Sequence, residues 1–305
     1  MASDVEEARR IWDFVVAPPR TAPGVTSMVG YRALDVPETV HRGLPSSTLT
    51  FIVSLDEGVE AARTADALPT ARPTPIILGG LHEQASHVRQ RRGQAGVQVA
   101  LHPLAARAVF GVPAAELSVT DFDAAPVLGR ASERLHHRVA DTRGWPGAFA
   151  LVAQYLLAGR RRHASVRPEV AYAWHLLGRS RGRTPVGVVA DQVGLSQRHL
   201  TTLFRREVGR TPKTVAMLMR FEYATARMAD AARGRRRVDL AGIAGEAGYA
   251  DQAHLTREFA RFAGVPPGVW LAEEFQNIQD GGHAARSQWC HDEFESNRLV
   301  DPAGA

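Results

Sequence analysis

The sequence predicts an α+β protein with a β-rich N-terminal domain, a helical connector, and an all-α C-terminal domain. In that last domain two helix-turn-helix motifs are joined by a long helix. Short apolar or alternating segments separated by glycine and proline precede His102-Pro103, and helical periodicity follows it. One pattern of apolar and polar residues then occurs twice between Thr184 and Trp270. The expected divisions are 1–125, 126–178 and 179–275, followed by a polar tail at 276–305.

Three segments of the N-terminal domain have the composition of strands. They are Thr48–Leu55, Pro75–Leu78 and Gly96–Leu101, which are β-branched, apolar or alternate with a period of two. Together they favour a small sheet or a partial barrel. Residues 1–16 are expected to form a short helix that ends before Pro18-Pro19.

Helices are expected from His102-Pro103 onward, because apolar residues recur there at helical spacing. The expected helices are Leu104–Phe110, Ala114–Leu117, Ala131–Asp141, Gly147–Leu157 and Val166–Gly178. Two interpretations of their apolar stripes stay open. The stripes form an isologous interface between two copies of the chain, or they pack against the chain's own domains.

The first copy of the doubled pattern has the features of a helix-turn-helix. Thr184 is the expected N-cap of its first helix, with Pro185 at the first helical position. Gly194 lies where the chain must turn sharply, which glycine allows at low cost. Ser196 is the expected cap of the second helix. The outward side chains of that helix are Gln197, Arg198, Thr201, Thr202 and Arg205.

The second copy repeats these features, with Asp251 as the expected cap of its second helix. The helix that connects the two copies is expected at Lys213–Ala232. Gly242 and Gly245 lie in the scaffold helix of the second copy, and each costs on the order of 1 kcal/mol relative to alanine. This copy is therefore expected to be the looser one. Its outward side chains are Gln252, Ala253, Thr256 and Arg257.

The doubled pattern resembles the tandem helix-turn-helix domain of the AraC/XylS family of bacterial transcription regulators. The matching motif is Gly248-Tyr249-x-Asp251-Gln252-x-His254-Leu255-x-Arg257-x-Phe259, followed by Gly264-x-Pro266-Pro267. The resemblance implies that recognition helices at about 196–207 and 251–262 enter successive major grooves of DNA. It assigns base contacts to Arg198, Thr201, Thr202, Gln252, Ala253, Thr256 and Arg257.

The charge distribution is consistent with an anionic partner, since the formal net charge is +5 and the isoelectric point is about 9.9. Arginines are concentrated in or beside the doubled pattern, where phosphates would lie. The expected phosphate contacts are Gln197, Arg205, Arg206, Arg235 and Arg236. Further expected partners are RNA polymerase and a second copy of the chain. The N-terminal domain is expected to act as a sensor that binds an unidentified small effector.

No motif predicts catalysis or a cofactor. His82-Glu83-x-x-x-His87 has one residue too many for the zinc-protease spacing, and no phosphate-binding glycine pattern occurs, so neither a metal nor a nucleotide is expected. The protein is expected not to be an enzyme. An enzymatic N-terminal domain and a pure interaction module are the alternatives. A single cysteine, Cys290, and an N-terminus without a secretion signal predict a cytoplasmic location.

Overall fold

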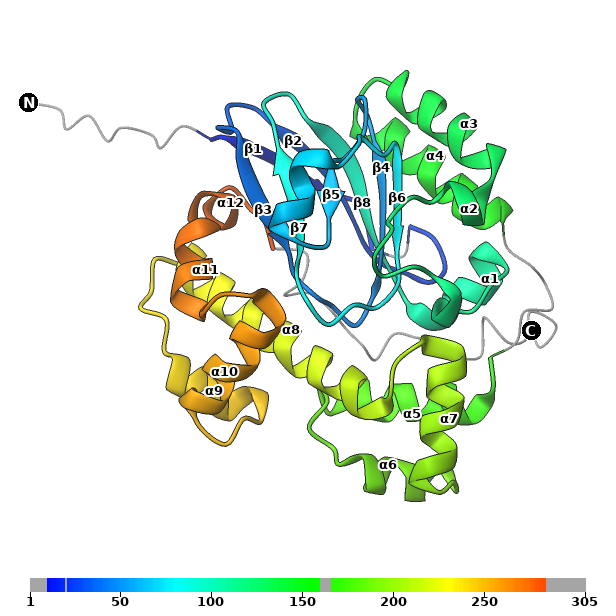
Figure 1. Ribbon diagram of the computed structural model, residues 1–305, viewed down its shortest axis with the longest axis vertical. Helices are drawn as coiled ribbons and strands as arrows, with labels where there is room; N and C mark the ends of the chain where they lie inside the picture. Colours follow the sequence, from blue (N-terminus) through cyan, green and yellow to red (C-terminus); the bar gives the residue numbers. More distant parts are fainter. Residues whose placement is uncertain (1–9, 20, 160–165, 284–305) are drawn as a thin grey trace, which may run out of the picture.

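The computed structural model describes residues 10–19, 21–159 and 166–283. The strands form two antiparallel sheets. In the view of Figure 1 the helices of residues 168–263 lie below the sheets, and those of residues 267–279 lie beside them at the left. The segment Trp289–Phe294 and the arginines at 160–162 lie outside the described residues. Among the described residues no helix is long and apolar enough to cross a membrane.

The larger sheet has the strand order β1-β2-β8-β4-β6. Its strands are β1 (Trp12–Val16), β2 (Val25–Ala33), β4 (Leu49–Ser54), β6 (Ile76–Gly79) and β8 (Ala95–Leu101). The smaller sheet has the order β3-β7-β5. Its strands are β3 (Thr39–Gly43), β5 (Ala61–Ala62) and β7 (Ser86–Gln90), and the short helix η1 (Ala65–Thr70) follows β5.

The expected helix at residues 1–16 is wrong, because the described part of this segment forms β1. This strand pairs with β2 over its whole length, from Trp12 opposite Ala33 to Val16 opposite Val29. The apolar residues around Trp12 suit a helix face and a strand equally well. Pairing with a strand that lies later in the chain decides between them.

The two faces of the larger sheet differ, as the period of a strand requires. Phe51 and Val53 of β4 and Val97 of β8 are fully buried on one face. Ile52 of β4 and Gln98 of β8 point to the other face, where the smaller sheet lies opposite and a cavity remains. The alternation therefore separates a core face from a face that lines the cavity.

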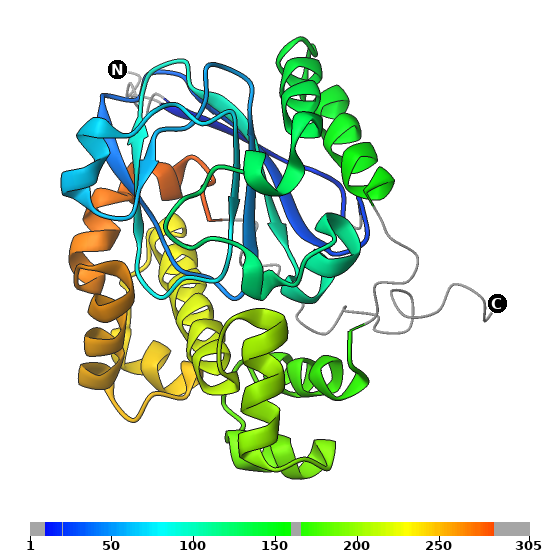
Figure 2. The same cartoon turned by 45° about the vertical axis from the view of Figure 1, so that its right-hand side comes forward.

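Helices cover the core face of the larger sheet, as Figures 1 and 2 show. Trp145 lies against Gly30 of β2, where even a methyl group would meet the indole ring, and Tyr155 stacks on Phe51 at 6.4 Å. The elements are η2 (Pro103–Ala105), α1 (Ala106–Phe110), η3 (Ala114–Glu116), α2 (Ala125–Leu128), α3 (Arg130–Ala140) and α4 (Trp145–Ala158). The apolar stripes of α3 and α4 thus pack within the chain, which favours the second interpretation.

The helical domain begins with α5 (Pro168–Arg179), whose Trp174 stacks on Phe204 at 6.3 Å. The range 126–178 is therefore divided between the two bodies of the fold, since α3 and α4 pack on the sheet and α5 on the helical domain. The remaining helices are α6 (Val186–Val193), α7 (Gln197–Val208), α8 (Pro212–Arg233), α9 (Leu240–Ala247), α10 (Gln252–Ala263), α11 (Pro267–Glu273) and α12 (Phe275–Gln279).

The described start of the expected polar tail is part of the folded body. Residues 275–279 form α12, Ile278 is fully buried, and Trp270 contacts His283 edge-on at 5.4 Å. The sequence of this stretch is polar, so its docking was not expected. The stretch is docked through Ile278, through the ring contact of His283 and through hydrogen bonds to the Asp280 carboxylate.

The second helix-turn-helix unit is held to α8 by an aromatic cluster. Phe221 of α8 lies 5.2 Å from Phe259 and 5.0 Å from Phe262, and Phe259 lies 5.6 Å from Trp270, as measured between ring centroids. All four rings are buried. We expect Phe259→Ala to lower the free energy of unfolding by about 3–5 kcal/mol, the usual cost of removing a buried phenyl ring.

Chemical denaturation followed by circular dichroism measures this loss. The control is Phe275→Ala, since Phe275 is 53% exposed and a surface substitution changes stability by only about 0.5 kcal/mol. Equal effects of the two substitutions would show that the cluster does not support the unit.

Candidate nucleic-acid interface

The first helix-turn-helix unit consists of α6 and α7. Gly194, with a φ of 77°, ends α6 in the left-handed region, and Ser196 caps α7 by accepting a hydrogen bond from the His199 amide at 3.2 Å. The expected cap Thr184 is wrong. Pro185 is the N-cap of α6, and no side chain forms a capping hydrogen bond there. The proline takes the extended backbone of a cap itself, so α6 begins one residue later than expected.

The second unit, α9 and α10, repeats this geometry. Gly248 ends α9 with a φ of 81°, and the Asp251 carboxylate accepts from the His254 amide at 2.6 Å. Asp239 caps α9 by accepting from the Gly242 amide at 3.0 Å. A side chain at Gly242 would collide with that carboxylate. This glycine therefore makes room for the cap, a role that the sequence analysis missed.

Both recognition helices present their polar side chains to solvent and their apolar side chains to the core. Leu200 and Phe204 of α7 are fully buried. Leu255 and Phe259 of α10 are also fully buried. Of the predicted base contacts, Thr201 and Thr256 are half-buried, and the exposed ones are Arg198, Thr202, Gln252, Ala253 and Arg257. The Thr202 hydroxyl donates to the Arg198 carbonyl at 3.0 Å within the helix.

The predicted phosphate contacts lie in two places. Gln197, Arg205 and Arg206 are exposed on α7. Arg235 and Arg236 lie in the turn between α8 and α9, where Arg235 has a φ of 51°. Together with Arg10 they line an open groove beside α12, away from the recognition helices. The sequence had placed all five in a single group.

Contacts with the connecting helix α8 help to fix the relative orientation of the two units. The Arg181 guanidinium, between α5 and α6, lies 4.4 Å from the centre of the Tyr223 ring on α8. The Glu246 carboxylate of α9 accepts hydrogen bonds from Tyr223 at 3.1 Å and from Arg227 at 3.0 Å. These hydrogen bonds, first that from Arg227, lower the pKa of Glu246. Figure 1 shows the units at the two ends of α8.

The sheet domain contacts the first unit through ion pairs. The Arg107 guanidinium donates to both carboxylate oxygens of Glu207, at 3.1 and 2.8 Å, and Arg210 lies 3.3 Å from Glu83. Ser47 of the sheet domain donates to the buried carboxylate of Glu222 on α8 at 2.5 Å. These contacts hold the end of α7 and the middle of α8 against the sheets.

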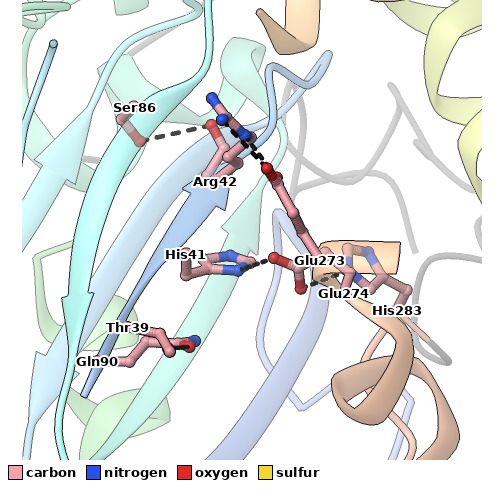
Figure 3. Close-up of polar contacts among 9 residues, drawn as sticks. Thr39, His41, Arg42, Ser86, Gln90, Glu273, Glu274 and His283 are labelled. Carbon is pink, nitrogen blue, oxygen red and sulfur yellow. Dashed lines mark hydrogen bonds and ion pairs between the residues drawn. The ribbon is translucent and has the colours of Figure 1, made fainter. Parts of the chain in front are cut away.

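A second set of contacts, shown in Figure 3, attaches the second unit. His41 Nδ1 lies 2.7 Å from a Glu274 carboxylate oxygen, and His283 lies 3.8 Å from the other oxygen. Arg42 donates to Glu273 at 2.7 Å. Burial opposes ionisation of Glu274, but His41 and His283 outweigh it and hold the pKa of Glu274 well below its usual range.

The backbone of β1 is also bound by α12. The amides of Ile11 and Trp12 both donate to the carboxylate of Asp280 at 2.9 Å. Such charge-assisted hydrogen bonds are among the stronger ones in proteins. The start of the first strand of the larger sheet is therefore fixed to the end of α12 in the helical domain.

A cavity of about 140 Å³ lies between the two sheets. Its wall includes His41, the partner of Glu274, and Asn277 of α12. The helical domain thus forms part of the wall. Of the histidines of the rejected zinc motif, His82 follows β6 and also lines the cavity, and His87 lies in β7. Among the described residues no group of three or more histidine, cysteine or acidic side chains is placed to hold a metal ion.

Comparison with known proteins identifies the helical domain. Residues 189–273 match a family model described as a helix-turn-helix domain. The matched domain is of the AraC type. The resemblance inferred from the doubled motif is therefore confirmed for this segment. Among curated proteins none matches the chain.

Solved structures with a similar fold include ToxT from Vibrio cholerae. A structure of its P21 crystal form has 12% sequence identity and a TM-score of 0.46, covering 85% of this chain and 98% of that chain. ToxT from strain O395 bound to (E)-4-(8-methylnaphthalen-1-yl)but-3-enoic acid has the same identity and TM-score, with 88% and 99% covered. A ToxT with bound unsaturated fatty acid has 9% identity and a TM-score of 0.45, with 85% and 94% covered.

The Glu274 contact makes the stability of the protein depend on pH. A carboxylate whose pKa is lower in the folded state stabilises the fold above its unfolded pKa of about 4.5, and this contribution is lost as the pH falls. We expect Glu274→Gln to be less stable than the unsubstituted protein at neutral pH. The difference should shrink below about pH 4.5.

Urea denaturation at a series of pH values measures the difference. Glu273→Gln is the matched control, because the Glu273 side chain is 39% exposed and an exposed ion pair contributes only about 0–1 kcal/mol. A difference between unsubstituted protein and Glu274→Gln that does not vary with pH would show that the charge of Glu274 does not hold the contact.

Proposed function

We propose that the chain is a sequence-specific transcription regulator that places α7 and α10 in successive major grooves on one face of DNA. In this proposal residues 179–275 bind DNA, and the sheet domain, residues 1–125, controls them. The observation that carries it is the repeated capped geometry of the two units, each with a buried apolar face and an exposed polar one. The hydrogen bonds from Tyr223 and Arg227 of α8 to Glu246 of α9 support a fixed position of the second unit on the connecting helix.

Base contacts are assigned to the exposed and half-buried side chains of the two recognition helices. Arg198, Gln252 and Arg257 have the reach and the donors for bidentate contacts with guanine or adenine. Thr201, Thr202, Ala253 and Thr256 are shorter and suit apolar or single contacts. Gln197, Arg205 and Arg206 are assigned to phosphates, which position the helices without selecting a sequence.

Control is proposed to come from a small effector in the cavity between the sheets. A molecule there would touch both domains, since Asn277 of α12 forms part of the wall. It would also touch His41, which pairs with Glu274. A ligand that binds one arrangement of the domains better than another shifts their equilibrium by its difference in affinity. RNA polymerase and a second copy of the chain remain partners proposed from the resemblance alone.

Selection of genomic binding sites with the purified full-length protein tests this function. The expected result is a motif with two half-sites, about one helical turn or 10 base pairs apart, whose affinity falls steeply with salt because bound arginines release counterions. An inverted pair of such motifs would indicate a dimer. No enrichment of any sequence, or enrichment of one half-site only, would overturn the proposal.

Arg257→Ala separates base recognition from phosphate binding. We expect a loss of about 1–3 kcal/mol in binding free energy, together with relaxed preference at one base pair of the selected site. Fluorescence anisotropy on a set of single-base variants of the site measures both effects.

Arg261→Ala is the matched control for Arg257→Ala. Arg261 is exposed in the last turn of the same helix, and its guanidinium lies 4.3 Å from the centre of the Phe262 ring. Its removal should leave base preference unchanged. A uniform loss on all sequences for Arg257→Ala would assign Arg257 to the phosphates instead.

A further inference from the structure

The cavity between the two sheets has the size of a single ring. Its volume is about 140 Å³, close to that of the engineered cavity of about 150 Å³ that binds benzene in another protein. The volume therefore suits a single ring. The wall itself is built from both sheets, from Phe122 in the segment after η3, and from Asn277 of α12.

The wall combines apolar side chains with neutral hydrogen-bonding groups. Its apolar part includes Trp12, Phe14, Tyr31, Ile52, Ile77 and Phe122. Its polar part includes the amides of Gln90, Gln94, Gln98 and Asn277. An amide both donates and accepts hydrogen bonds, so it suits hydroxyl, carbonyl or amide groups on a ligand. The side-chain amide oxygen of Gln90 already accepts a hydrogen bond from the Thr39 hydroxyl at 3.1 Å (Figure 3), and this bond orients the Gln90 side chain.

No lysine, arginine, aspartate or glutamate contributes to the wall. The charges immediately behind it are carboxylates. Glu274 lies behind His41 at 2.7 Å, and the negative charge of Asp56, after burial, helps to raise the pKa of the Tyr31 hydroxyl. An anionic ligand would lose its hydration here and find no lysine or arginine, and the His41 imidazole in the wall is already bound to the Glu274 carboxylate.

The wall also offers no available carboxylate partner for a cationic ligand. The Glu274 carboxylate is already paired with His41 and His283. Trp12, the largest aromatic side chain of the wall, is 4% exposed and stacks on Phe14 at 5.5 Å, so its ring face is not open for a cation–π contact.

We propose that this cavity binds a neutral single-ring molecule that carries hydroxyl, carbonyl or amide groups, and that it excludes carboxylates and ammonium-type cations of the same shape. The inference rests on the proposed function, because it names the class of effector for the site described there. The bound ring lies between the apolar side chains of the larger sheet and the amides around it, in contact with both domains.

Three probes of nearly equal shape separate the alternatives: benzamide is neutral, benzoate is an anion and benzamidine is a cation at neutral pH. Titration calorimetry and thermal unfolding with the full-length protein should show benzamide binding about tenfold or more tightly than either ion, since the unpaired ions pay an uncompensated desolvation cost. Equal or tighter binding of benzoate or benzamidine overturns the inference. Binding of none of the three at millimolar concentration overturns it as well.

A charge placed in the cavity gives an independent test. Gln98 is exposed on the central strand β8 and lines the cavity, so Gln98→Lys should fold and should reverse the preference toward benzoate. Thr26→Lys is the matched control. It adds the same charge at an exposed position of β2 outside the cavity wall and should keep the preference for benzamide. Failure of Gln98→Lys to change the preference would place the binding site elsewhere.

The same preparations are assayed for binding to the selected DNA. Specific DNA binding without the expected ligand preference overturns this inference and leaves the regulator function intact. Absence of specific DNA binding overturns the regulator function, whichever probe binds.

Discussion

The buried carboxylate of Glu274 is the contact on which the arrangement of the whole molecule depends. It lies at the end of α11, between His41 of the smaller sheet and His283 after α12. A buried carboxylate without partners would be strongly unfavourable, so the contact holds only when both domains are in place. This ion-pair cluster therefore joins the cavity wall, through His41, to the helix that follows the second helix-turn-helix unit.

The two recognition helices are positioned by a frame with two sides. On one side α8 and the contacts of Glu246 with Tyr223 and Arg227 join the units to each other. On the other side the sheet domain holds the first unit at Glu207 and the second at Glu274. A change in either set of contacts would move one unit relative to the other. In the proposed function, such a movement would alter how the two helices fit successive grooves of DNA.

Local patterns predicted the local features well. Ser196 and Asp251 act as caps, Gly194 and Gly248 make the turns, and the apolar faces of both recognition helices are buried. Each depends on a few neighbouring residues, so its signal lies within one short stretch. The failures have the opposite cause. The strand at Trp12–Val16 exists because it pairs with β2 and because its first amide groups bind Asp280. Neither partner is visible from the segment itself.

The sequence alone therefore determined the class of the C-terminal domain, the polar faces of its two recognition helices and the alternation that separates the two faces of the larger sheet. Only the tertiary structure decided that α3 and α4 cover the sheet, that α12 docks on β1, and that no lysine, arginine, aspartate or glutamate lines the cavity. The reason is the range of the interactions. Caps, turns and periodicity act over a few residues, whereas His41 and Glu274, or Ser47 and Glu222, meet across most of the chain's length. The sequence around each of these residues contains no pattern that predicts its partner.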